Sequence, residues 1–472
     1  MKIRNPRTGE EDYAIAPLDS AALAQCAAAA RAWQRGWTAR SPEERCAILT
    51  RLADAIAAHR APIAEALTID TGRRAISGIE VDGVVGMARR WAGSAPALIA
   101  AAIGEERDSA TPGIRVATRL HAFPVIGCIS PWNFPLTLAL IDAIPALAAG
   151  CAVIVKPSEV TPRFIVPLRA AIAEIPELAD GLQLIEGDGA TGAALIEAVD
   201  FVCFTGSVAT GRKVGEAAAR AFIPASLELG GKDAMIVLDG CDPAAAAATA
   251  LRASVVNTGQ ACQSIERILV AAPLHDAFVT ALATQARAVR LNHPDIGSGE
   301  IGPFIFARQA AIAQAHIDEA VAGGAIVLAG GTVETLGGGL YLRPTVLTDV
   351  DPAMAVWREE SFAPILPVIA FGGEAEAVAL ANDSEFGLSA AVLGPTLAAA
   401  EAVAVQLDAG AVSINDGALT SMVWDAEKSS FGASGLGPSR MGDSGLLRFF
   451  RRQALLKQTG RPLPLAAFAE RS

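Results

Sequence analysis

The sequence predicts an α/β protein with two sheet-containing domains, and three observations support this. The chain has 472 residues, which is too long for one ordinary core. From about residue 125, short apolar strands alternate with helical stretches, a rhythm typical of parallel sheets covered by helices. The rhythm restarts after Lys232, which predicts a second α/β domain.

The N-terminal part is predicted to be helical. Residues 19–60 are rich in alanine with charges at helical spacing and predict two amphipathic helices. The second helix should begin at Ser41, because Pro42 suits the first helical position and Glu44 completes a capping box. Residues 61–103 continue the helical pattern, and the polar stretch 104–118 then interrupts it.

The first sheet is predicted from five short strands, at Val125–Ile129, Cys151–Val155, Leu182–Glu186, Phe201–Phe204 and Ala225–Leu227, with helices at about 136–149 and 163–175. The second sheet is predicted from strands at Ala234–Leu238 and Ile268–Ala271, with helices at 243–257 and 274–290. Ligands of parallel sheets bind at the carboxyl ends of the strands. Most of the polar motifs in this sequence follow such ends.

Two further segments are predicted to be exposed strands outside these sheets. Arg115–His121 alternates like an exposed strand, and a second strand-like run extends from Phe449 to Leu456. The later run could pair with the earlier one or with another subunit.

Composition excludes several classes of function. A formal net charge of −12 disfavours nucleic acid and anionic membranes as partners. Seven cysteines without a C-x-x-C pair indicate neither a disulfide framework nor a zinc site, so no metal is expected. The N-terminus lacks the apolar region of a signal peptide, and no apolar run reaches the length of a membrane span. We therefore expect a cytoplasmic protein.

Three residues are candidates for catalysis, although each has a plainer interpretation. Cys262 lies in a polar, glycine-containing loop where a thiolate could act as a nucleophile, but a free cysteine is more often a small core residue. Glu228 precedes Leu229-Gly230-Gly231-Lys232 and could be a general base or a solvated turn acid. Asn133 lies between Pro131 and Pro135, where its amide could serve an oxyanion hole or satisfy a turn.

Two further turns are candidates for a nucleotide site. Lys156, Ser158 and Glu159 follow the second strand, and an acid there could bind ribose hydroxyls and repel a 2′-phosphate. Gly206, Ser207 and Gly211 follow another strand with G-x-x-x-x-G spacing, and their amides could approach a pyrophosphate at a helix start. The alternatives are a solvated charged turn and an ordinary glycine-rich helix start.

The order of these motifs resembles the NAD(P)-dependent aldehyde dehydrogenase superfamily. Pro-Trp-Asn-Phe-Pro, Lys-Pro-Ser-Glu, Phe-Thr-Gly-Ser, Glu-Leu-Gly-Gly-Lys and Gly-Gln-x-Cys follow one another in the family's order. Further matches are Asn5–Glu10, Tyr341–Val346, Glu359–Pro364, Phe386–Ala390 and Gly410–Asn415, so the resemblance runs from residue 5 to about residue 450.

The resemblance implies a fold and a reaction. It implies a Rossmann-like NAD-binding domain at 1–103 and 123–232, a catalytic domain at 233–432, and an oligomerisation arm at 104–122 and 445–460. It also implies NAD-dependent oxidation of an aldehyde to a carboxylate, and assembly as a homodimer or homotetramer. A CoA-acylating enzyme and a non-catalytic binding or structural relative are the alternatives.

The resemblance also implies residue roles. Cys262 would form the thiohemiacetal and thioester, Asn133 and the Cys262 backbone N–H would bind the oxyanion, and Glu228 would activate the hydrolytic water. Lys156 is expected to serve both catalysis and cofactor binding. The other predicted cofactor residues are Trp132, Ser158, Glu159, Gly206, Ser207, Gly211, Leu229, Glu360 and Phe362.

Two motifs depart from the family pattern. Ala363 stands where the family has glycine in Glu-Glu-x-Phe-Gly-Pro. The usual Pro-Phe-Gly-Gly-x-Lys-x-Ser-Gly reads Ser430-Phe431-Gly432-Ala433-Ser434-Gly435, without the lysine. That segment lies near the substrate entrance in the family, so aromatic, aliphatic and semialdehyde substrates all stay open.

Overall fold

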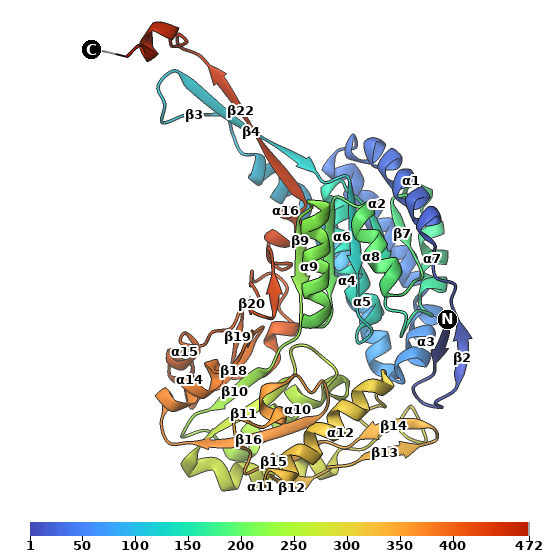
Figure 1. The fold of residues 1–472 in the computed structure, drawn as a ribbon, viewed down its shortest axis with the longest axis vertical. Helices are drawn as coiled ribbons and strands as arrows, with labels where there is room; N and C mark the ends of the chain where they lie inside the picture. The colour runs from blue at the N-terminus through green and yellow to red at the C-terminus, as the bar shows by residue number, and fades with distance from the viewer. Residues whose placement is uncertain (471–472) are drawn as a thin grey trace.

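The computed structural model describes residues 1–470, which form two open sheets with covering helices and a projecting three-stranded arm (Figure 1). The chain begins with a hairpin that the sequence did not predict, formed by β1 (Lys2–Arg4) and β2 (Glu11–Ala14). Among residues 1–470, no helix is both long enough and apolar enough to cross a membrane.

Four N-terminal helices follow the hairpin: α1 (Ser20–Thr38), α2 (Pro42–Ala58), α3 (Arg60–Thr71) and α4 (Arg74–Ile103). The predicted capping box of α2 is confirmed, because Ser41 accepts the Glu44 N–H and Glu44 accepts the Ser41 N–H. α3 ends at Gly72, whose φ of +68° suits glycine. A Cβ there would lie 2.6 Å from the Pro303 ring, so the chain can turn closely against this proline only with glycine.

The first sheet has the strand order β21-β9-β8-β5-β6-β7, and all neighbours are parallel except the edge strand β21. Its strands are β5 (Val125–Ile129), β6 (Ala152–Lys156), β7 (Leu182–Leu184), β8 (Phe201–Thr205), β9 (Ala225–Glu228) and β21 (Gly435–Leu436). Its other elements are α5 (Pro135–Leu140), α6 (Ala143–Ala149), α7 (Ile165–Ala173), η1 (Pro176–Leu178), α8 (Gly189–Ala198) and α9 (Val208–Ala221).

Alternating side chains of these strands bury two separate apolar clusters on opposite faces. One cluster joins the sheet to α2, α4, α5, α6 and α7, and the other joins it to α1, α8 and α9. The predicted arrangement of a largely parallel sheet with helices on both faces is therefore confirmed, and Figure 1 shows helices on the two sides.

The prediction of one helix over 136–149 is wrong, because the helix breaks into α5 and α6 at Ile141 and Asp142. Pro145 explains the break, since proline has no N–H to donate to the carbonyl four residues earlier and its ring crowds that carbonyl. The break leaves Asp142 at the start of α6, buried with 2% of its surface exposed.

The second sheet has the order β12-β15-β16-β11-β10-β18-β19, with only β12 antiparallel to its neighbour. Its strands are β10 (Asp233–Val237), β11 (Ile265–Ala271), β12 (Ile326–Ala329), β15 (Thr345–Thr348), β16 (Ile365–Phe371), β18 (Ala390–Leu393) and β19 (Val412–Ile414). The other elements here are α10 (Pro243–Val255), η2 (Val256–Gly259), η3 (Ala272–Leu274), α11 (His275–Ala288), α12 (Ala307–Ala322), β13 (Val333–Leu336), β14 (Gly339–Leu342), α13 (Ala355–Arg358), α14 (Glu374–Asn382) and α15 (Leu397–Ala404).

After the second sheet the chain returns to the first. It passes through η4 (Leu419–Ser421), β20 (Phe431–Gly432), which pairs with β17 (Phe386–Gly387), then β21 and α16 (Ser444–Leu447). The arm follows, in which β22 (Phe450–Gln458) pairs antiparallel with β4 (Ile114–Ala122), and β4 pairs with β3 (Arg107–Asp108). Of the two pairings open for the last strand, the one within the chain is present; η5 (Leu465–Phe468) follows it (Figure 1).

Candidate active site

Cys262 lies in the loop between η2 and β11, and its side chain is half-buried. The chain turns tightly in η2, just before this loop, where Asn257 and Thr258 have φ values of +61° and +59°. Gly231, three residues after Glu228, packs on this loop, since a Cβ on Gly231 would lie 2.6 Å from the Cys262 carbonyl oxygen. The Glu228 loop and the Cys262 loop are therefore in direct contact.

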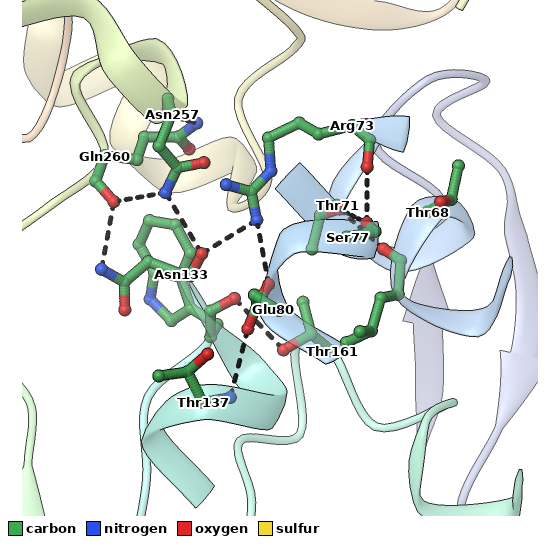
Figure 2. A network of polar contacts seen from close by, with 12 residues as sticks. Thr68, Thr71, Arg73, Ser77, Glu80, Asn133, Thr137, Thr161, Asn257 and Gln260 are labelled. Atoms are coloured by element: carbon green, nitrogen blue, oxygen red, sulfur yellow. Dashed lines mark hydrogen bonds and ion pairs between the residues drawn. The ribbon is translucent and has the colours of Figure 1, made fainter. Parts of the chain in front are cut away.

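Asn133 meets the Cys262 loop from the other side. It follows β5, is 3% exposed, and its Nδ2 donates to the Gln260 carbonyl at 3.0 Å. Asn257 Nδ2 donates to the same carbonyl at 2.8 Å and to the backbone carbonyl of Asn133 at 3.2 Å (Figure 2). The backbone of Asn133 and one N–H of its side-chain amide are thus both fixed, and such preorganisation is the property an oxyanion hole requires.

A buried ion pair supports Asn133 from behind. Arg73, which precedes α4, donates from Nη2 to the Asn133 carbonyl at 2.9 Å. Glu80 in α4 lies 3.8 Å from the same nitrogen and accepts the Thr137 N–H at 3.2 Å, as Figure 2 shows. Both side chains are at most 4% exposed, and burial raises the pKa of Glu80 to about 7.

Glu228 ends β9, at the carboxyl edge of the first sheet. Its Oε2 accepts a hydrogen bond from Ser430 Oγ at 2.9 Å, and its Oε1 lies 4.0 Å from Arg440 Nε. Thus the carboxylate has a hydroxyl on one oxygen and a guanidinium near the other.

The Cys262 thiol is held in its protonated form. Burial raises its pKa to about 12, and the carboxylates of Glu360, Asp233 and Glu228 contribute in the same direction, whereas Lys428 opposes them. Because the thiolate is the nucleophilic form, a nearby base must take the proton when the sulfur reacts.

The predicted ribose-binding residues lie together at the end of β6. Lys156 Nζ donates to Glu159 Oε2 at 3.1 Å and to the Gly187 carbonyl at 3.0 Å. Ser158 Oγ accepts the Val160 N–H at 3.2 Å, so its hydroxyl hydrogen is free for another acceptor. The three side chains present a cation, a carboxylate and a hydroxyl on one turn.

Gly206, Ser207, Gly211 and Leu229 form the neighbouring turn. Ser207 caps α9, because its Oγ accepts the Thr210 N–H at 3.3 Å. A Cβ on Gly211 would lie 2.4 Å from Leu229, so this glycine lets the first turn of α9 approach the residue that follows Glu228. The structure thus brings a helix N-terminus beside the carboxyl end of β9.

Trp132, Phe362 and Glu360 form the third group of predicted cofactor residues. The rings of Trp132 and Phe362 meet edge to face, with centroids 5.4 Å apart. Glu360 Oε1 accepts the Gly231 N–H at 3.1 Å, and burial together with the charge of Glu266 raises its pKa to about 8. These residues come from two distant segments, and Gly231, which Glu360 contacts, packs on the Cys262 loop.

The donor set fits a nicotinamide dinucleotide. A helix N-terminus suits the pyrophosphate, the Glu159 and Glu360 carboxylates suit ribose hydroxyls, and the aromatic pair suits a flat ring. Gly211 has no side chain of its own in the first turn of α9, where the Leu229 side chain packs against it.

Sequence reasoning missed several residues of this region. Arg73, Glu80, Asp142 and Arg440 are buried charges in stretches that looked like ordinary helix or tail. Lys428 lies two residues before Ser430, where the motif that departs from the family pattern begins, and its charge acts on both Glu228 and Cys262. A charged residue inside an otherwise apolar helical stretch, such as Asp142, was the one available signal.

Comparisons with known proteins agree with this geometry. A model described as the Aldehyde dehydrogenase family matches residues 1–455. The chain therefore belongs to the aldehyde dehydrogenase family. It is an oxidoreductase that uses NAD or NADP.

Individual relatives cover almost the whole chain. The solved structure of Putative Aldehyde Dehydrogenase PutA from Anabaena variabilis is 49% identical, with a TM-score of 0.96 over 98% of this chain and 99% of that one. A betaine aldehyde dehydrogenase variant from Staphylococcus aureus, solved with NAD+, is 31% identical, with a TM-score of 0.92 over 100% and 96%. Putative succinate-semialdehyde dehydrogenase [NADP(+)] from Mycolicibacterium smegmatis is 36% identical over 95% of this chain and 87% of the relative.

These comparisons confirm the predicted family, fold class and reaction class, namely NAD(P)-dependent oxidation of an aldehyde. The roles of single residues stay predictions, as do the domain boundaries.

Proposed function

We propose that this protein oxidises an aldehyde to a carboxylate by hydrolysis of a thioester on Cys262, with Glu228 as the base and NAD as the preferred cofactor. The observation that carries the proposal is the meeting of three segments. Asn133 bonds to the Gln260 carbonyl, two residues before Cys262, and Gly231 of the Glu228 loop packs on the Cys262 carbonyl.

The first step needs a thiolate and an oxyanion site. The sulfur of Cys262 attacks the aldehyde carbon, and its proton passes to Glu228, directly or through a water. The oxyanion that forms is stabilised by Asn133 Nδ2 and the Cys262 N–H. Bound NAD supplies the hydride acceptor that turns this adduct into a thioester.

The second step is hydrolysis. Glu228 first releases to solvent the proton it took from Cys262. It then takes a proton from water, and the resulting hydroxide attacks the thioester carbon; the C–S bond breaks and Cys262 leaves as a thiolate. Asn133 stabilises the second oxyanion as it did the first. Lys156 is predicted to serve both catalysis and cofactor binding. In this proposal it acts through Glu159, because its ammonium group donates a hydrogen bond to that carboxylate.

The test of the nucleophile is NADH formation with a panel of benzaldehyde, hexanal and succinic semialdehyde. Cys262→Ala should abolish it, whereas Cys26→Ala, another half-buried cysteine, should leave it unchanged. Full activity in Cys262→Ala would refute the proposal. A requirement for free CoA would instead support the acylating alternative, and no turnover of any panel member would favour a non-catalytic relative.

The preference for NAD rests on the position of Glu159. Its carboxylate ends the ribose-binding turn, where it would repel the 2′-phosphate of NADP, although Lys156 offsets part of this charge. We expect kcat/KM to be higher with NAD, and Glu159→Gln to narrow the difference. A kcat/KM for NADP equal to or above that for NAD would contradict this choice.

We also propose the domain roles and the assembly. The first sheet with residues 1–103 and 123–232 would bind the cofactor, and residues 233–432 would carry the nucleophile. The projecting strands β3, β4 and β22 would join subunits into a homodimer or homotetramer (Figure 1). A monomer by light scattering would contradict the assembly. Reduced cysteines favour a cytoplasmic location, which cell fractionation would test.

A further inference from the structure

Both partners of the Glu228 carboxylate come from the segment 430–440, which begins with the motif that departs from the family pattern. Ser430 Oγ donates to Oε2 at 2.9 Å, and Arg440 Nε lies 4.0 Å from Oε1. The segment 430–440 enters the first sheet through β21, where Gly435 pairs with Glu228 itself. Ser434 fixes this register, because its carbonyl accepts the Leu229 N–H at 2.8 Å.

Arg440 is held in a buried cluster of charges. Its Nη2 donates to Asp142 Oδ2 at 3.0 Å and to Thr205 Oγ1 at 2.6 Å. Arg448 bonds to the other oxygen of Asp142 and donates to Ser226 Oγ at 2.8 Å. Thr205 and Ser226 belong to the strands that end beside Glu228, so the cluster lies directly behind the carboxylate.

The charges of this cluster balance only when Glu228 is included. Two guanidinium groups face one carboxylate, Asp142; although burial alone would raise the pKa of Asp142, the two arginines outweigh it and lower that pKa. Asp142 is therefore ionised and leaves one positive charge in excess. Glu228 supplies the second negative charge.

One donor of Arg440 is still open. Its Nε is buried and has no hydrogen-bond partner, and it is the atom nearest to Glu228 Oε1. Leaving a buried charged donor without a partner is costly, so a short movement of the Glu228 carboxylate toward Nε would satisfy both groups.

We propose that Arg440 is a positioning residue for Glu228: Asp142 and Thr205 fix its guanidinium, which holds the carboxylate in place between reaction steps. This inference rests on the proposed role of Glu228 as the base. A fixed cation at this distance attracts the carboxylate and limits the positions it can take, and a base must lie within reach of the water it activates.

The inference predicts that the loss of Arg440 affects hydrolysis more than acylation. The other charged and titratable groups whose fields act around Glu228 are Arg448, Lys428 and the Cys262 thiol. Arg440 lies 4.0 Å from the carboxylate and is itself held by Asp142 and Thr205, so its removal should leave the base free to move away from the hydrolytic water.

The experiment compares Arg440→Gln with Arg440→Lys, which keeps the charge. The aldehyde is the panel member that wild type oxidises fastest, with NAD. Single-turnover NADH formation reports acylation, and rapid quenching with intact-protein mass spectrometry follows the acyl group on Cys262. Both rates are measured from pH 6 to pH 10, with thermal denaturation as the folding control.

For Arg440→Gln we expect hydrolysis about 10-fold slower and acylation changed less than 3-fold across this pH range. Arg440→Lys should restore most of the loss. An unchanged hydrolysis rate in a folded Arg440→Gln protein would overturn the inference, as would equal loss of both rates at every pH. If wild type formed no acyl-Cys262, the proposed function would fail instead.

A second variant keeps the test decisive if Arg440→Gln does not fold. Thr205→Val removes one of the two side chains that fix the Arg440 guanidinium and keeps every charge of the cluster. In this variant hydrolysis should slow more than acylation does. Wild-type rates for both steps in folded Thr205→Val would overturn the inference.

Discussion

The two sides of the Cys262 loop are built differently. On one side, Asn133 is held by hydrogen bonds to or from Gln260, Asn257 and Arg73, all of them buried (Figure 2). On the other side, Glu228 has one hydrogen bond from Ser430 and a looser contact of 4.0 Å with Arg440.

The difference matches what each group would have to do. An oxyanion donor works by being in place before charge develops, so movement would only reduce its effect. A base must take and release protons and reach a water on the substrate, so a rigid cage would hinder it. A fixed donor beside a loosely held carboxylate is therefore the arrangement that thioester hydrolysis requires.

The largest expected effect is on the loosely held side. Glu228→Gln should leave a single turnover of NADH formation measurable but reduce steady-state turnover about 10³-fold, because water is no longer activated. Mass spectrometry after mixing with aldehyde and NAD should show acylated Cys262. If the variant turned over at the wild-type rate with no trapped acyl group, Glu228 would not be the base.

On the fixed side, Asn133→Ala should slow the single-turnover NADH step itself about 10²-fold, since one oxyanion donor is lost. Acyl-Cys262 should not accumulate, because both steps slow together. The ratio of acylation to hydrolysis thus separates the two sides. Accumulation of the acyl group in Asn133→Ala would show that Asn133 serves hydrolysis alone.

The sequence could predict the parts that depend on local pattern. Cys262, Asn133 and Glu228 each follow a strand or a helix that periodicity predicts, and their order along the chain identifies the family. The same holds for the capping box at Ser41 and for the strand at Arg115–His121.

The supporting charges could not be predicted in this way. Arg73 and Asn133 are 60 positions apart, and Arg440 and Asp142 are 298 apart, so only the fold brings them together. Nothing local distinguishes Arg440 from a surface arginine near the C-terminus. The break before α6, where Asp142 meets Arg440, depends on Pro145. The spacing of apolar residues alone does not predict this break.

A smaller effect is expected from the support behind Asn133. Arg73→Met removes the donor to the Asn133 carbonyl and leaves Glu80 buried without its cation. We expect a loss of about 3 kcal/mol in the free energy of unfolding and an acylation rate about 10-fold lower. Urea denaturation and single-turnover kinetics measure the two effects. Arg60→Met, at an exposed ion pair with Asp82, is the control and should change neither by much.

The smallest expected effect is a change in how stability depends on pH. In the folded protein burial raises the pKa of Glu80 to about 7, above its ordinary value of 4.5, so the unfolded chain gives up this proton first as pH rises. Glu80 therefore favours folding at low pH, and this contribution declines between about pH 4.5 and pH 7. In Glu80→Gln that decline should disappear. The free energy of unfolding of the variant, relative to that of wild type, should therefore be higher at pH 8 than at pH 5, by up to about 3 kcal/mol. The difference in free energy of unfolding between wild type and Glu80→Gln, measured in urea at both pH values, isolates this group from the other carboxyls. A difference that does not change with pH would mean that Glu80 stays ionised beside Arg73, and that the support behind Asn133 is an ordinary ion pair.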